Sequence, residues 1–556
     1  MKNVKRLLAL LLVAVMLMGT MIGCAKKTED EKTEEKETST TVTNAPVDSG
    51  EVTEAPADLF AEKITFTMSV VDAEKAGFTD SGEVAENFKW FCEKFNVEFD
   101  FWPLTWSNYV TQTSMWLNSD SAPDLIMLDV APVRYGEYLE WVDAGLFRPY
   151  PDLAAYPNLA MRFDAMTTGK KFAIDGTLYA FPSYLDSGKY NNVIATGYTY
   201  RKDWAQAVGL YKENDVYTWE EWKALVAAVV AQDPGKNGAG NTIGMISNSA
   251  WGFPNYFLGE LAKSMYGFVK DDSGNWVWGP TLPDSLEAVV TTKQMYDDGL
   301  IWADQPMVVE GDAGNNLNAG KLFASVNTNI TANGFRQVVK GFSDANPELN
   351  AEDCLAVAKV KGPSGKYFAK QGSDQWSQTA MNHNLSDEKA ERWLAMLDYL
   401  VSDDGYNFKI FGIPEVDWKY DAEGNAVCLW TGKDENGNLV NPYGNSGTSP
   451  WTRCSGSVDG FQLVNPSIPQ WVKDQVISAL ATYSGPESNV VLLDVEKEFF
   501  VSDTFAEATA GLDAEVYAKV AELMTSDDIA TDWTNWVTQK AIEVQPAIDE
   551  LNANVK

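Results

Sequence analysis

Apolar and polar residues alternate in two different ways between residues 64 and 128. Over residues 64–70 apolar side chains occupy every second position, which is the period of a strand with one buried face. Apolar positions then follow at helical spacing over 84–95, and strict alternation returns over 97–101. The uninterrupted apolar run 125–128 indicates a strand buried on both faces. This order of strands and helices predicts an α/β fold with a parallel sheet covered by helices.

Helical spacing also recurs in the later part of the chain. Thr218 and Glu221 form a capping box ahead of apolar positions that continue to Val230. Ser386 is placed to cap a second helix, whose apolar positions share one face as far as Val401. The sequence shows no internal repeat, so these elements predict a folded α/β protein and not a solenoid.

The length of the chain predicts at least two lobes. The part after residue 59 has about 500 residues, which exceeds what a single hydrophobic core supports. A polar segment at 187–192 separates two apolar stretches and is a candidate hinge. Ligands of parallel sheets bind beyond the carboxyl ends of the strands. We therefore expect the loops that start at Asp72, Trp102 and Asp129 to face a cleft between the lobes.

The N-terminus has the pattern of an exported protein. A basic start is followed by the apolar run 7–18, which is shorter than the ~18 apolar residues that a spanning helix needs. The residues before Cys24 resemble a bacterial lipobox, and the segment 24–59 is polar, charged and unable to bury a core. We predict a signal peptide at 1–23, a lipid on Cys24 and a disordered tether that holds the rest on the outer face of a bacterial cell membrane. An uncleaved membrane anchor is the alternative.

Composition and charge exclude several classes of function. The chain is 45% hydrophobic and 12% aromatic, as expected for a folded protein, and its formal net charge is −36. So negative a chain repels polyanions, which argues against a nucleic-acid partner. Beyond Cys24 the four cysteines lack zinc-site spacing. Cys428 and Cys454 are the pair to test for a disulfide, and free thiols are the equally open alternative.

Several short segments in the middle of the chain resemble one family of proteins, the extracellular solute-binding proteins of bacterial ABC importers. The likeness is to the large, maltose-binding-like family 1 lipoproteins, which include receptors for oligosaccharides. The segments that carry it are YRKDW at 200–204, TWEEW at 218–222, DPGKNG at 233–238, NTIG at 241–244, MYDDGLI at 295–301 and GPSGK at 362–366.

The resemblance implies a two-lobed, hinged fold of the type II periplasmic-binding-protein kind. Both lobes would be discontinuous, with 60–190 and 375–445 in lobe 1 and 191–374 and 446–556 in lobe 2. It also implies a monomer that binds without reacting and delivers its ligand to the transmembrane subunits of an ABC permease.

In this family the loop at 233–244 often resembles a calcium-binding EF-hand. Here Asp233, Asn237 and Asn241 could supply oxygens, whereas Gly235 and Gly244 have no side-chain oxygen at positions where an EF-hand has one. We therefore predict a plain turn and no cofactor, with a structural calcium ion as the alternative.

The tryptophans bear most on the kind of ligand. The chain has 20 of them, and several lie beside polar residues in predicted loops. A sugar ring has an apolar face and a rim of hydroxyls, so a sugar receptor combines aromatic plates with carboxylate and amide partners. We expect stacking from both lobes, with a packing role as the alternative for each ring. The candidates are Trp106, Trp251, Trp376 and Trp451.

Polar candidates follow the predicted strands. Asp129 ends the buried strand 125–128, Asn327 ends a later apolar run, and Tyr184 lies just before the candidate hinge. Arg453 could contact an acidic sugar, although a structural ion pair is the alternative.

Two other functions stay open on the sequence alone. A glycoside hydrolase needs two carboxylates about 5–10 Å apart, and 79 acidic residues make chance pairs common. A receptor for peptides or uronic acid oligosaccharides is the other possibility. His383 is the only histidine, and the chain has no nucleophile elbow or P-loop, so the sequence favours an oligosaccharide receptor.

Overall fold

The structure is a computed structural model that describes residues 60–556 except 72, 74–82, 186–189, 191–192, 196, 248–257, 328–329, 436, 445–448 and 458. The predicted signal peptide, lipidated cysteine and tether lie outside the described residues. No helix within the described ranges is long and apolar enough to cross a membrane.

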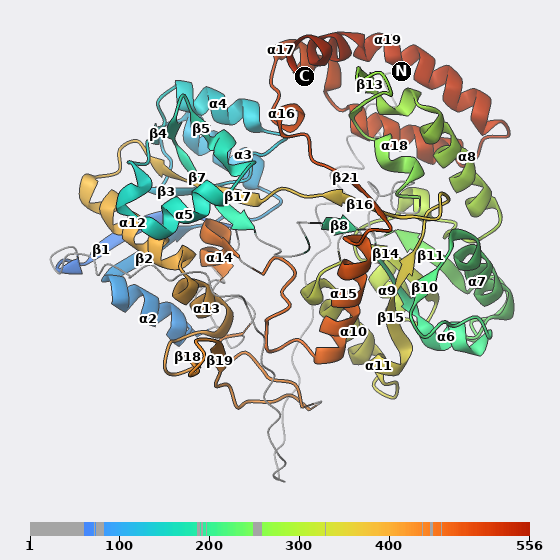
Figure 1. The fold of residues 1–556 in the computed structure, drawn as a ribbon, viewed down its shortest axis with the longest axis horizontal. Coiled ribbons are helices and arrows are strands. Elements are labelled where there is room, and N and C mark those ends of the chain that lie inside the picture. Colours follow the sequence, from blue (N-terminus) through green and yellow to red (C-terminus); the bar gives the residue numbers. More distant parts are fainter. Residues whose placement is uncertain are drawn as a thin grey trace, which may run out of the picture. The chain divides into compact units, whose positions relative to one another are not determined.

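Lobe 1 is built on a seven-stranded sheet with the order β2-β1-β3-β17-β7-β20, in which β4 also pairs with β17 (Figure 1). β1 is parallel to β2 and β3, whereas β17 is antiparallel to β3 and β7. The strands are β1 Ile64–Ser69, β2 Val97–Trp102, β3 Leu125–Leu128, β4 Phe147–Arg148, β7 Ala180–Leu185, β17 Gln375–Asn382 and β20 Gly456–Ser457. The helices are α2 Glu86–Phe95, α3 Tyr109–Asn118, α4 Tyr135–Asp143, η3 Leu153–Ala155, α5 Pro157–Ala165, η4 Gly169–Phe172, α12 Asp387–Val401, α13 Asp403–Phe411 and α14 Ser449–Ser455.

Lobe 2 is built on a five-stranded sheet with the order β10-β15-β9-β14-β11, in which β9 is antiparallel to its neighbours. The strands are β9 Gly197–Arg201, β10 Val216–Tyr217, β11 Ile243–Ser247, β14 Leu322–Asn327 and β15 Leu355–Val360. The helices are α6 Lys202–Ala207, α7 Trp219–Gln232, η7 Leu261–Ser264, η8 Gly279–Thr281, α8 Pro283–Asp297, η9 Gln305–Met307, α9 Asp312–Asn318, α10 Ala332–Ala345, α11 Ala351–Cys354, α15 Gln470–Tyr483, α17 Asp503–Thr509, α18 Leu512–Leu523 and α19 Ile529–Asn554.

A third sheet joins segments that run between the lobes. It has the order β21-β16-β8, with β8 Val193–Ala195, β16 Tyr367–Gln371 and β21 Ser488–Val491. β8 follows the last long strand of the first part of lobe 1, and β16 precedes the return of the chain to lobe 1 at β17. Three hairpins complete the strands: β5 Ala173–Ile174 with β6 Thr177–Leu178, β12 Phe268–Lys270 with β13 Trp276–Trp278, and β18 Trp418–Tyr420 with β19 Ala426–Cys428.

Each lobe has its own hydrophobic core. In lobe 2 successive residues of β15 alternate between two clusters: Leu355 and Val357 belong to one, whereas Ala356 and Ala358 belong to the other. This sheet is therefore buried on both faces, as parallel-rich sheets are. The core of lobe 1 collects the apolar residues of β1, β3, α2 and α12.

The predicted elements of lobe 1 are confirmed as β1, α2, β2 and β3, and the capping box of Thr218 and Glu221 opens α7. The predicted lobe boundary at residue 445 is wrong. Trp451 and Cys454 of α14 lie in the lobe 1 core, and β20 pairs with β7, so lobe 1 continues to residue 457. The four cysteines beyond Cys24 are free thiols, and no disulfide joins Cys428 to Cys454.

Candidate functional site

Four of the predicted site residues meet at one edge of the lobe 1 sheet. Trp106 follows β2, Asp129 directly follows β3, and Tyr184 lies near the end of β7. Trp376 lies at the start of β17, which runs antiparallel and so begins where the other strands end. This is the edge at which open α/β sheets bind ligands.

Trp106 and Trp376 form an exposed aromatic pair. Their rings are stacked, with centroids 5.8 Å apart and planes inclined by 27°. Trp106 is 45% exposed and Trp376 38%, and no other tryptophan among the described residues is as exposed. Exposed apolar side chains that form a contiguous patch, as these two rings do, are a feature of binding sites. The pair can therefore offer flat apolar area to a ligand.

Arg453 supports the aromatic pair. Its guanidinium carbon lies 5.1 Å from the ring centroid of Trp106 and 5.2 Å from that of Trp376. Both distances are in the range of cation–π contacts. Arg453 thus holds two rings from different segments together.

Hydrogen bonds fix the backbone around Asp129. The Asp129 amide donates to the Tyr109 hydroxyl (2.5 Å), and the Val130 amide donates to Gln378 Oε1 (3.3 Å). Gln378 Nε2 in turn donates to Gln375 Oε1 (2.6 Å). These bonds tie the end of β3 to α3 and β17, so the Asp129 carboxylate sits on a rigid support.

The environment of Asp129 affects its charge. Burial raises the pKa of the Asp129 carboxyl, and the positive charges of Arg134 and Arg453 act in the opposite direction. Arg134 is itself held by Glu137, with Nε–Oε1 and Nη2–Oε2 distances of 2.7 and 2.6 Å. A carboxylate in this setting is a suitable acceptor for ligand hydroxyl groups.

The structure does not place all the other predicted residues at this edge. Trp451 is fully buried and packs on Phe88 and Phe91, with centroid distances of 5.7 and 4.5 Å. The prediction that Trp451 contacts a ligand is therefore wrong. Trp251 and the side chain of Asn327 lie outside what the structure describes, although Asn327 does end β14 as predicted. Tyr184 is half-buried, with the Arg162 guanidinium 5.7 Å from its ring centroid.

Two residues of this site were not predicted from the sequence. Tyr109 and Arg134 lie at the starts of α3 and α4, where their helical context suggested no site. The Arg134 guanidinium lies 5.4 Å from the Tyr109 ring centroid. Their position after parallel strands was the signal that could have identified them.

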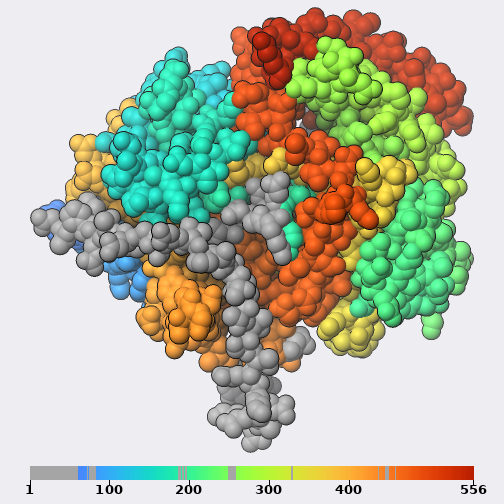
Figure 2. Space-filling view, in the orientation of Figure 1, coloured from blue at the N-terminus to red at the C-terminus, as the bar shows by residue number. Residues whose placement is uncertain are grey.

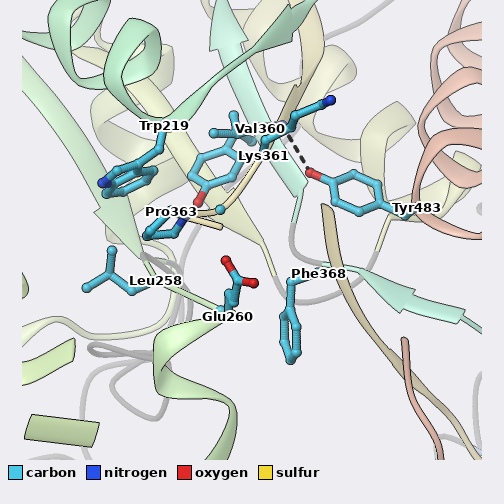
Figure 3. Close-up of a pocket in the computed structure, with 11 residues that line it drawn as sticks. Trp219, Leu258, Glu260, Val360, Lys361, Pro363, Phe368 and Tyr483 are labelled. Carbon is cyan, nitrogen blue, oxygen red and sulfur yellow. Dashed lines mark hydrogen bonds between the residues drawn. The ribbon is translucent and has the colours of Figure 1, made fainter. Parts of the chain in front are cut away.

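Lobe 2 has a pocket at the corresponding edge of its own sheet (Figure 3). It is a solvent-open hollow where β10 and β15 end, and its volume of about 360 Å³ includes open solvent. The Glu260 carboxylate points into the pocket and accepts hydrogen bonds from the amide and hydroxyl of Ser364. Trp219 and Phe368 supply apolar walls. The pocket thus combines a carboxylate with aromatic rings, as the lobe 1 edge does.

The sheet between the lobes extends this surface. Ile194 and Val491 flank Lys370 in register across β8, β16 and β21, and both apolar side chains are exposed. Phe368, two residues before Lys370, lies on the same face of β16 and lines the pocket. The opposite face carries Tyr367 and Ala369, which belong to a buried cluster.

The loop at 233–244 is a hydrogen-bonded turn. Asp233 Oδ1 accepts from the Asn237 amide (2.9 Å) and the Thr242 hydroxyl (2.5 Å), and Asp233 Oδ2 accepts from the Gly238 amide (2.8 Å). The side-chain amide nitrogen of Asn241, Nδ2, donates a hydrogen bond to the backbone carbonyl of Asn237. The same aspartate-to-amide bond over four residues closes three other turns, at 271–275, 421–425 and 434–438.

This donor set does not fit a calcium ion, which takes about six to eight oxygen ligands. Asp233 is the only carboxylate among the positions that would bind the ion, because Gly235 and Gly244 have no side-chain oxygen. Across the described residues no group of three or more histidine, cysteine, aspartate or glutamate side chains could hold a metal.

Comparison with known proteins identifies the fold. No protein-family model matches the sequence, and neither does any curated protein. Among solved structures, the alginate-binding protein AlgQ2 matches with a TM-score of 0.60 and 13% identity, over 89% of this chain and 98% of that one. The chain has the fold of the ABC-transporter substrate-binding proteins.

Two further structures show the same likeness. An EF-hand mutant of the S. pneumoniae substrate-binding protein FusA, in complex with fructo-nystose, matches with a TM-score of 0.61 and 15% identity, over 88% of this chain and 98% of that one. A solute-binding protein from Bifidobacterium longum infantis, described as binding HMO, matches with a TM-score of 0.59 and 16% identity over the same shares.

Proposed function

We propose that this chain is the substrate-binding lipoprotein of an ABC importer and belongs to the family 1 receptors for oligosaccharides. It captures a carbohydrate between its two lobes and delivers the sugar unchanged to a membrane permease. The observation that carries the proposal is the exposed Trp106–Trp376 pair at the ligand-binding edge of lobe 1, beside the Asp129 carboxylate.

Three further observations support a sugar as the ligand. The aromatic pair can stack on the apolar face of a sugar ring while Asp129 accepts hydrogen bonds from its hydroxyls. The pocket of lobe 2 offers Glu260 and Phe368 for a second part of the same molecule. Of the structural neighbours named above, one is described as binding alginate, one is in complex with fructo-nystose, and one is described as binding HMO.

A thermal-shift screen of the protein against neutral and acidic oligosaccharides tests this function, with chromatography of each mixture afterwards. A ligand at 100 times its dissociation constant stabilises the folded state by about 2.7 kcal/mol. We expect a shift with the sugar recovered intact. Cleavage of the sugar would indicate a glycoside hydrolase, and a shift with peptides alone would contradict the carbohydrate ligand.

Attachment to the membrane through Cys24 is part of the same proposal. The basic start, the short apolar run and the lipobox-like residues before Cys24 support it. We expect cells expressing the chain to incorporate labelled palmitate into it, and Cys24→Ser to abolish the label. Equal labelling of the variant would contradict lipidation at this cysteine.

A further inference from the structure

The segment after β21 contacts both lobes within a few residues. Residues 492–501, called the strap here, include the short helix α16 Val495–Glu498. The Phe499 ring lies edge-on against the Tyr135 and Phe172 rings of lobe 1, with centroid distances of 4.9 and 6.2 Å. The next residue, Phe500, packs on Phe505 of lobe 2 at 5.5 Å. In Figure 2 the orange-red chain of this region meets the teal surface of lobe 1.

Ion pairs repeat this division between the lobes. Glu496 pairs with Lys171 of lobe 1 at 2.7 Å, whereas Asp494 pairs with Lys270 of lobe 2 at 3.1 Å. At the end of the strap, a Cβ placed on Gly136 of α4 would lie only 3.3 Å from Val501 Cγ1. The strap is therefore fixed to each lobe by both an apolar and a charged contact.

The lobe 1 contact adjoins the candidate site. Tyr135 is the first residue of α4 and directly follows the loop 129–134, which begins with Asp129. Arg134, next to Tyr135, contacts the Tyr109 ring, and the Tyr109 hydroxyl accepts the Asp129 amide. Packed contacts thus connect the Phe499 ring to the backbone of Asp129.

We propose that Phe499 is a positioning residue for ligand binding, through which the C-terminal part of lobe 2 fixes the loop 129–134 of lobe 1. A ring from one lobe that is packed into the other restricts their relative motion, and ligand affinity depends on the population of the arrangement that binds. Phe499 acts here without being part of the ligand surface, since its described contacts are with Tyr135 and Phe172.

Hydrogen–deuterium exchange of the full chain in detergent, without ligand, tests this role. For Phe499→Ala we expect faster amide exchange in residues 129–138 and in β8 and β16, with Phe499→Tyr restoring the wild-type rates. Trp536→Ala is the matched control, because the described ring contacts of Trp536, with Trp278 and Trp533, lie within lobe 2 and outside the strap, and it should leave residues 129–138 unchanged. If Phe499→Ala altered exchange only within the strap, the proposal would be overturned.

A second arm measures binding and rests on the proposed function. With the neutral trisaccharide kestose as probe, we expect about fivefold weaker binding by Phe499→Ala and unchanged binding by Trp536→Ala. Unchanged binding by both variants would contradict a positioning role. The exchange measurement needs no ligand, so it decides the role of the strap separately from the question of whether sugars bind.

Discussion

At the scale of single residues, the account depends on two exposed rings and one carboxylate. Replacing Trp106 with alanine removes one stacking surface and one contact of Arg453. Because an aromatic contact contributes about 1 kcal/mol or more, we expect the affinity for sugar to fall about tenfold. Calorimetric titration measures this. Trp536→Phe on α19 is the control. An equal loss of sugar affinity in both variants would contradict a specific role for Trp106.

Asp129 makes a separate prediction about pH. Its pKa is raised by burial, so its carboxylate takes up a proton at a higher pH than an ordinary aspartate does. If the carboxylate accepts sugar hydroxyls, affinity is full above this raised pKa and declines as the pH falls through it. Titrations from pH 7 downward should show the decline in the wild type, whereas Asp129→Asn should bind weakly with a flat profile. A decline that persists in the variant would assign it to another group.

At the scale of elements, the pairing of β20 with β7 depends on a glycine. Gly456 has φ +77°, and a Cβ there would lie 1.8 Å from the Tyr184 carbonyl oxygen. We expect Gly456→Ala to lower the free energy of unfolding by about 2 kcal/mol or more. Gly432→Ala is the control, because nothing lies within 4 Å of its added Cβ. Chemical denaturation measures the unfolding midpoints of both variants. Similar midpoints would contradict the close approach of Gly456 to the Tyr184 backbone.

The elements also show what the sequence could predict. Local periodicity identified β1, α2, β2 and β3, and the rule for parallel strands brought Trp106 and Asp129 to one edge. Trp376 was a candidate only because polar residues flank it, and the antiparallel pairing of β17 that brings it to the same edge was not predicted. Trp451 could not be assigned in this way. Pro450 and Thr452 flank it in sequence and give no sign of a core position, and its burial comes from Phe88, more than 350 residues away along the chain.

At the scale of the whole molecule, the net charge of −36 bears on the ligand. Charge repulsion disfavours acidic ligands and is screened by salt, whereas contacts to a neutral sugar depend little on ionic strength. We expect the affinity for a neutral oligosaccharide to stay the same between about 0.05 and about 0.5 M NaCl. A loss of more than tenfold would indicate that charge pairing dominates and would favour an acidic ligand.

Whole-molecule features were only partly accessible from the sequence. Length and the polar segment before β8 predicted two lobes and a hinge. The placement of α14 in lobe 1 and the contact of Phe499 with Tyr135 depend on residues distant in sequence, for which periodicity gives no signal.

A crystal structure of the chain with a bound oligosaccharide tests the central claim most directly. The account predicts a sugar ring stacked on Trp106 or Trp376, a hydroxyl within hydrogen-bond distance of Asp129, and contacts from the pocket around Glu260 to the same molecule. A sugar bound away from both the lobe 1 edge and the lobe 2 pocket, or cleaved in the site, would contradict it.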